Sequence, residues 1–172
     1  MLRFHELAVV LVLSGVAGAL LLPGAAESEP TTIGDYQAWS AARFTDQQIG
    51  TCYAVSKPVE STPQNVRRGE IYVMVSRRSS GQADELIVAF GYPFQSGATA
   101  RASIGDSGFD LTTGNEFGWL PEADDVQSLV KAMINGQQMT VKGVSARGTQ
   151  TVDTYSLLGF TAAYRAILQA CK

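Results

Sequence analysis

Short segments with the composition of β-strands, separated by turn residues, fill most of the chain after residue 34. The segments are rich in Val, Ile, Tyr, Phe and Thr, and Gly, Asp or Ser interrupts them about every 8 to 12 residues. This spacing favours an antiparallel sandwich or barrel over βαβ units. We therefore predict a mainly β domain, an antiparallel β-sandwich or barrel-like fold. Its strands are expected at 36–44, 50–59, 70–77, 85–92, 98–104, 108–113, 138–145 and 149–157, with a short one ending at residue 120.

Two turns predict hairpins within this β pattern. Asp106-Ser107-Gly108 and Ala146-Arg147-Gly148 each separate two segments with alternating apolar residues. Glycine supplies the positive φ that a tight hairpin turn requires. The flanking segments should therefore pair in antiparallel fashion.

Two helices are expected to accompany the sheet, at about 121–135 and about 160–171. Pro121 suits the start of the first helix, and acidic residues in its first turn favour the positive end of the helix dipole. Apolar residues then recur with helical spacing. The predicted buried stripes are Val126, Leu129, Val130 and Met133 in the first helix and Phe160, Ala163, Tyr164, Ile167 and Cys171 in the second.

The amino-terminal segment reads as an export signal. Residues 7–22 carry no charge, and Pro23-Gly24-Ala25-Ala26 supplies small side chains for cleavage after Ala26. A retained membrane anchor is the alternative, although about 16 apolar residues fall short of the roughly 20 that span a bilayer. We predict a signal peptide at 1–26, a flexible lead-in at 27–34 and a single domain at 35–172, with no stable membrane span after cleavage and a periplasmic or secreted location.

The two cysteines, Cys52 and Cys171, are predicted to form one disulfide. In an exported protein an isolated pair is most simply a structural bond, here between the start of the domain and its last helix. A reactive or metal-binding thiol is the alternative. No CxxC motif accompanies either cysteine, and the one histidine, His5, lies in the predicted signal peptide.

Residue types that carry chemistry are sparse. Without a histidine after the signal peptide, Ser-His-Asp catalysis and His-containing zinc sites are excluded. The glycine-rich stretches match neither the P-loop nor the GxGxxG pattern. A net charge of −3, from 13 basic and 16 acidic residues, argues against nucleic acid as a partner. We therefore predict no enzymatic activity, no cofactor and no metal site.

Four arginines form a candidate binding patch. Arg67, Arg68, Arg77 and Arg78 flank the segment 70–75 and would suit an anionic glycan, a lipid headgroup or an acidic partner. Solvated strand ends that discourage edge-to-edge pairing are the alternative. A set of aromatic residues would line a ligand cavity if the sheet closed, with core packing as the other explanation: Tyr53, Tyr72, Phe90, Tyr92 and Phe94.

Several stretches resemble the invasion-associated locus B family of exported bacterial proteins. They are residues 52–58 (CYAVSKP), 68–75 (RGEIYVMV), 91–94 (GYPF), 129–133 (LVKAM) with Gly136 and Met139, 147–163 (RGTQTVDTYSLLGFTAA) and the closing Cys171. The resemblance implies one secreted or periplasmic β-rich domain without established activity or cofactor, in a family named for a link to host-cell entry. Some members carry a further cysteine after a Gly-Asp-Trp, but Gly34-Asp35-Tyr36 here has none, so a second disulfide is not implied.

These observations lead to two functional hypotheses. The first is an exported, non-enzymatic binding domain whose partner is an unidentified envelope or host-surface component. The resemblance connects it with host-cell invasion or envelope function. The alternative is a small-ligand carrier with a lipocalin-like cavity.

Overall fold

One open antiparallel sheet forms the framework of the protein in the computed structural model, which describes residues 29–46, 49–80 and 83–172. The sheet has the order β1-β2-β3-β5-β6-β9-β8-β7-β10-β11-β4. Its outer strands, β1 and β4, do not pair with each other, so the sheet does not close into a barrel. The predicted mainly β, antiparallel fold with two helices is confirmed. The strands are β1 (Thr31–Tyr36), β2 (Trp39–Asp46), β3 (Ile49–Ser56), β4 (Glu60–Thr62), β5 (Tyr72–Arg78), β6 (Glu85–Ala89), β7 (Ala100–Ile104), β8 (Ser107–Gly114), β9 (Phe117–Trp119), β10 (Gln138–Val144) and β11 (Gln150–Ser156).

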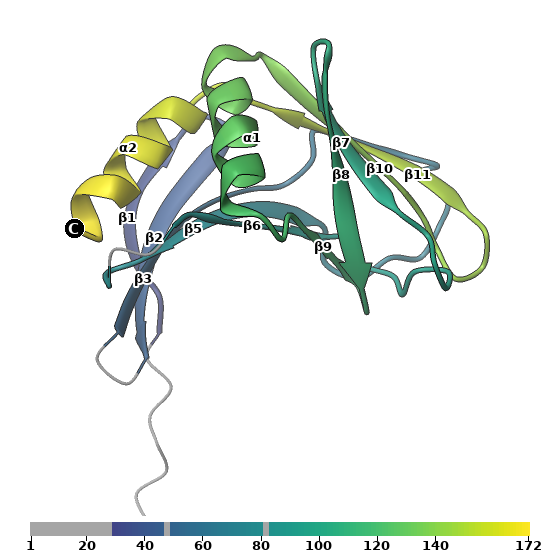
Figure 1. Ribbon diagram of the computed structural model, residues 1–172, viewed down its shortest axis with the longest axis horizontal. Helices are drawn as coiled ribbons and strands as arrows, with labels where there is room; N and C mark the ends of the chain where they lie inside the picture. The colour runs from purple at the N-terminus through teal and green to yellow at the C-terminus, as the bar shows by residue number, and fades with distance from the viewer. Residues whose placement is uncertain (1–28, 47–48, 81–82) are drawn as a thin grey trace, which may run out of the picture.

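Strand β8 joins the two halves of the sheet. Its first residues pair with β7, from Ser107 to Leu111, and its last residues pair with β9, from Thr112 to Gly114. The strands β1, β2, β3, β5 and β6 therefore lie on one side of this junction, and β7, β10 and β11 lie on the other (Figure 1). The sheet bends at the junction.

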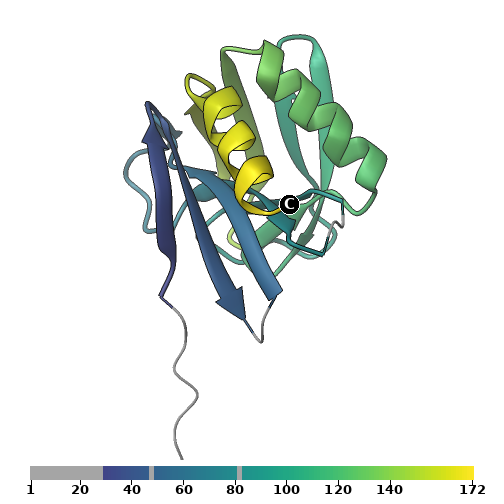
Figure 2. The same ribbon diagram turned by 90° about the vertical axis from the view of Figure 1, so that its left-hand side faces the viewer.

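Both helices cover the same face of the sheet, where they lie side by side (Figure 2). Helix α1 (Ala123–Asn135) buries the predicted stripe of Val126, Leu129, Val130 and Met133. Helix α2 (Phe160–Ala170) buries Phe160, Ala163 and Ile167 against β1, β2 and β3. Each helix begins and ends within two residues of its predicted bounds. Neither of these described helices combines the length and the apolar character that a membrane crossing requires.

The first strand corrects the prediction for residues 27–34. From Thr31 onward this segment is β1, which pairs with β2 from Thr31 opposite Arg43 to Tyr36 opposite Trp39. The single strand expected at 36–44 is thus divided by a hairpin turn. Exposed edge strands lack a strong apolar alternation, so backbone pairing rather than hydrophobic pattern orders this segment. The predicted signal peptide at 1–26 lies outside the described residues.

The two predicted hairpins are present, as β7–β8 and β10–β11. In the β7–β8 hairpin the turn lies at residues 105–106, so it begins one residue before the predicted turn at 106–108.

The predicted disulfide between Cys52 and Cys171 joins β3 to the residue that follows α2. The other end of α2 is fixed by Gly159, whose φ of 92° is the left-handed conformation that glycine tolerates best. A Cβ atom at this position would collide with the Tyr36 carbonyl oxygen. Both ends of α2 are therefore held against the first three strands.

Candidate functional site

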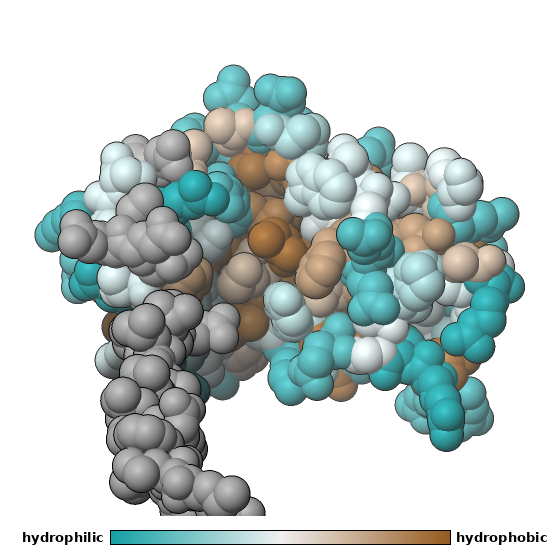
Figure 3. Space-filling model, turned by 90° about the horizontal axis from the view of Figure 1, so that it is seen from below, coloured by the Kyte–Doolittle hydropathy of each residue, from teal (hydrophilic) through white to brown (hydrophobic). Residues whose placement is uncertain are grey.

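A large open groove lies where β5, β6 and β9 meet the start of α1. It has a volume of about 1010 Å³. We call it the apolar groove because Tyr72, Ile87, Phe117, Trp119 and Leu120 contribute much of its lining. Viewed from below, on the side opposite the helices, the molecule has apolar surface gathered in a hollow near its middle (Figure 3).

Strand alternation explains how apolar residues reach this outer face. In β5 and β6, the residues Val73, Val75, Leu86 and Val88 are buried in the helix-covered core. The residues between them point to the other face of the sheet. There Met74 lies opposite Ile87, and Ile87 lies opposite Trp119. The sheet is therefore apolar on both faces in this region.

A compact ion cluster borders the groove and connects it to α2. The Asp84 carboxylate accepts hydrogen bonds from Arg77 Nε at 2.7 Å and from the Tyr164 hydroxyl at 2.5 Å. Asp84 is buried and also lines the groove. Burial, followed by the hydrogen bond to Asp84, raises the pKa of Tyr164 to about 12. The cluster therefore fixes the turn before β6 against α2.

The raised pKa of Tyr164 predicts a loss of stability in strong alkali. A folded-state pKa above the ordinary value of 10.0 contributes stability that is complete below pH 10 and is lost as the pH rises towards 12. We expect the Tyr164→Phe variant to show a shallower fall in unfolding free energy over this range. Denaturant titrations of both proteins at several pH values measure the difference. Absorbance titration of tyrosinate in both proteins checks the assignment. If Tyr164, the tyrosine that the variant lacks, ionises at the same pH as tyrosines of ordinary pKa, the assignment is wrong.

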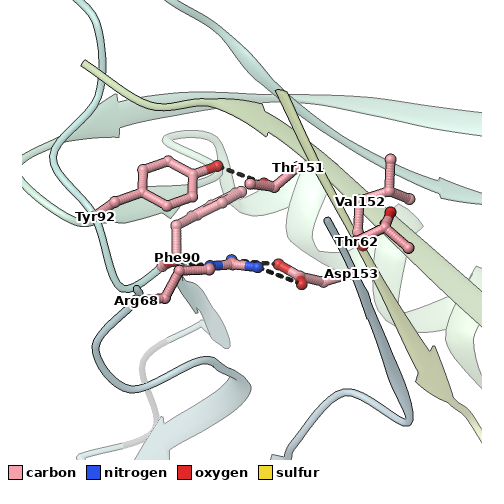
Figure 4. A network of polar contacts seen from close by, with 7 residues as sticks. All are labelled: Thr62, Arg68, Phe90, Tyr92, Thr151, Val152 and Asp153. Atoms are coloured by element: carbon pink, nitrogen blue, oxygen red, sulfur yellow. Dashed lines mark hydrogen bonds and ion pairs between the residues drawn. The ribbon is translucent and has the colours of Figure 1, made fainter. Parts of the chain in front are cut away.

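A buried arginine–carboxylate pair lies in the other half of the molecule (Figure 4). Arg68 Nη1 and Nη2 donate to the two carboxylate oxygens of Asp153 at 2.7 and 2.6 Å, and Arg68 Nε donates to the Phe90 carbonyl at 2.9 Å. The side chains of Arg68 and Asp153 are 6% and 0% exposed. The pair connects the segment before β5 to β11.

A close backbone contact brings this arginine to an aromatic ring. Gly69 N donates to the Gly91 carbonyl at 2.8 Å, and a Cβ atom on Gly91, whose φ is 67°, would lie 2.8 Å from the Gly69 backbone. The next residue, Tyr92, places its ring 5.1 Å from the Arg68 guanidinium carbon, within the range of a cation–π contact. Glycine at position 91 thus permits the contact between Arg68 and Tyr92.

The structure divides the predicted arginine patch. Arg67 and Arg68 precede β5, whereas Arg77 and Arg78 end it. Arg68, Arg77 and Arg78 each pair with a carboxylate, on Asp153, Asp84 and Glu85 respectively. Among the residues that the structure describes, Arg67 is exposed and has no ion pair. The four arginines are not brought together into one surface.

The predicted aromatic set also divides. Phe90 and Tyr92 are buried in the core, and Phe94 packs on both, with ring centroids 4.7 and 5.4 Å apart. Tyr72 lines the apolar groove. Sequence reasoning missed Phe117 and Trp119, although their spacing of two residues places them on one face of a strand.

The described part of the chain has no group of three or more His, Cys, Asp or Glu residues arranged to hold a metal ion. What the fold defines is a small, disulfide-linked domain in which two helices cover one face of an open antiparallel sheet. The chain belongs to the invasion associated locus B (IalB) family, whose model matches residues 39–168.

A solved structure shows the same fold. The crystal structure of invasion associated protein b from Bartonella henselae superposes with a TM-score of 0.55 at 12% sequence identity, over 81% of this chain and 96% of that one. No functionally curated protein matches the sequence. At this identity the likeness establishes the fold alone.

Proposed function

We propose that the protein is an exported, non-enzymatic binding protein that holds an apolar segment of a protein partner in the apolar groove. The groove itself carries the proposal, because aromatic and aliphatic side chains of β5, β6 and β9 gather there beside the start of α1. The partner is an envelope or host-surface component, in keeping with the family's association with invasion, and the site of action is the periplasm or beyond it.

The residue types in the groove suit a protein partner. Trp, Tyr and Arg dominate the energetics of protein interfaces, and the groove includes Trp119, Tyr72 and Arg78. Phe117 is 40% exposed, so its ring is accessible to a partner in the groove. Polar residues such as Glu85 and Asn115 share the lining. An apolar centre with polar surroundings is the usual anatomy of a binding surface.

The principal buried carboxylates support binding over catalysis. Asp84 and Asp153 are both engaged by arginines within hydrogen-bonding distance, so their charge is already compensated. The chain's one histidine, His5, lies in the predicted signal peptide. A carrier of the lipocalin kind encloses its ligand in a closed barrel, whereas this sheet is open and its helix-covered face is packed with core side chains.

Site-specific photo-crosslinking tests the proposal. A photoreactive amino acid at position 117 is expected to form adducts with a discrete partner in living cells, because this side chain lies in the groove. Ile134 on α1 is the matched control, since it is also 40% exposed but lies outside the groove. With the partner identified, Phe117→Ser should weaken its binding about tenfold or more, the scale of an interface hot spot.

Equal adducts from positions 117 and 134 would show that the groove has no special role. Unchanged partner affinity in the Phe117→Ser variant would also contradict the proposal. Thermal unfolding of the Phe117→Ser variant and of the two photoreactive proteins controls for loss of the fold.

A further inference from the structure

A second pocket, of about 270 Å³, lies beside the buried Arg68–Asp153 pair and shares no residue with the apolar groove. We call it the arginine pocket. It contains three arginines and no carboxylate, and all but one of its lining side chains are polar. The lining residues are Asn65, Val66, Arg67, Arg68, Tyr92, Ser145, Arg147, Thr149 and Thr151.

The charges of two arginines in this pocket are uncompensated. Asp153 pairs with Arg68, but Arg67 and Arg147 are exposed and form no ion pair among residues 29–46, 49–80 and 83–172. They come from distant parts of the chain, one from the segment before β5 and the other from the β10–β11 turn. A concave surface with charge of one sign concentrates the field and attracts the opposite charge.

The floor of the pocket offers hydroxyl donors as well. The hydroxyls of Tyr92 and Thr151 lie 2.6 Å apart, and the two side chains point towards each other (Figure 4). Both residues are buried, at 5% and 2% exposure. Two hydroxyls carry two hydrogens and their mutual bond uses one, so one hydrogen remains available to an acceptor.

Ser145 contributes another donor. Its Oγ accepts the Thr149 backbone N–H at 3.2 Å, and in the part of the chain that the structure describes its own hydroxyl hydrogen has no acceptor. Buried polar groups are normally hydrogen-bonded, so donors left over at a pocket wall are available to an acceptor that enters the pocket. A tyrosine hydroxyl is protonated at neutral pH at its ordinary pKa of about 10, and burial raises the pKa of Tyr92 further.

We propose that the arginine pocket binds an oxyanion group: a phosphate, a sulfate or the carboxylate of an acidic sugar. In this site the guanidinium groups of Arg67 and Arg147 pair with the anion's charge, and the hydroxyls of Ser145 and of the Tyr92–Thr151 pair donate to its oxygens. The volume suits one such group or a single sugar ring, because sites for larger organic ligands begin near 300 Å³.

Isothermal titration of the folded domain with inorganic phosphate, sulfate and glucuronate tests this site, with sodium chloride at matched ionic strength as the reference. We expect saturable binding of at least one anion. Arg147→Gln should weaken it about tenfold or more, because a hydrogen bond to a charged group is lost. Thr151→Val, which replaces the hydroxyl with a methyl group of similar size, should weaken it several-fold. Arg165→Gln is the matched control, since Arg165 is an exposed arginine on α2 outside the pocket.

The anion bound most tightly identifies which kind of ligand carries the oxyanion. Phosphate or sulfate indicates a phosphate or sulfate ester, and glucuronate indicates an acidic sugar. Absence of saturable binding for all three anions overturns the proposal. So does binding that chloride reproduces, or binding that Arg147→Gln and Arg165→Gln weaken equally. Phe117→Ser should leave anion binding unchanged, so this site and the apolar groove succeed or fail separately.

Discussion

Replacing both Cys52 and Cys171 by alanine is expected to lower the free energy of unfolding by about 4 to 5 kcal/mol. The bond spans 119 residues of sequence, and a cross-link over so long a loop removes much of the unfolded chain's freedom. It also holds α2, an 11-residue helix too short to be stable alone, against β3. A domain at the lower end of the ordinary range of about 5 to 15 kcal/mol would have almost no stability left without it.

Equilibrium denaturation with guanidinium measures this loss. The wild-type protein under reducing conditions is the control, since it should unfold near the midpoint of the double alanine variant. Thiol titration of the unfolded, unreduced protein should find no free thiol at positions 52 and 171. Two reactive thiols, or a variant as stable as the oxidised wild type, would contradict the expectation.

Breaking the buried Arg68–Asp153 pair is the second change with a large expected effect. Asp153→Asn keeps the shape of the side chain but leaves the Arg68 charge uncompensated at 6% exposure. Removing one partner of a buried pair costs about 3 to 5 kcal/mol, because the remaining charge stays out of water. The same variant weakens the attachment between β11 and the segment before β5, so this part of the core should loosen first.

Asp110→Asn is the matched control for this substitution. Asp110 pairs with Arg101, but these side chains are 72% and 51% exposed, and an exposed pair contributes at most about 1 kcal/mol. The double variant Arg68→Met, Asp153→Leu should recover much of the lost stability because it leaves no buried charge. If the two Asp→Asn substitutions cost the same in urea denaturation, the buried pair does not have the role assigned to it.

Local patterns in the sequence predicted most of the elements. The helical spacing of Val126, Leu129, Val130 and Met133 identified α1 and its buried face, because one stripe of a helix meets the core. Turn residues located the hairpins β7–β8 and β10–β11. The strands that the sequence did not predict, β1 and β4, are the outer strands of the sheet, where hydrophobic alternation is weakest and pairing alone defines the strand.

The candidate sites were less accessible to sequence reasoning. The doublets Arg67-Arg68 and Arg77-Arg78 look alike in the sequence, yet Arg68 and Arg77 are paired with the buried carboxylates of Asp153 and Asp84. These carboxylates come from β11 and from the turn before β6, at sequence separations of 85 and 7 residues. Arg67, by contrast, shares its pocket with Arg147, which sequence reasoning placed only in a turn.

The sequence by itself determined the β-rich class of the fold and the two amphipathic helices, because composition and periodicity are read from local segments. It also determined the disulfide partners, because a chain with two cysteines allows one pairing. Only the tertiary structure decided that the sheet stays open, that Trp119 and Phe117 line a groove, and which arginines keep an uncompensated charge. Each of these features depends on contacts between residues far apart in the chain, and no local pattern records which distant residues will meet.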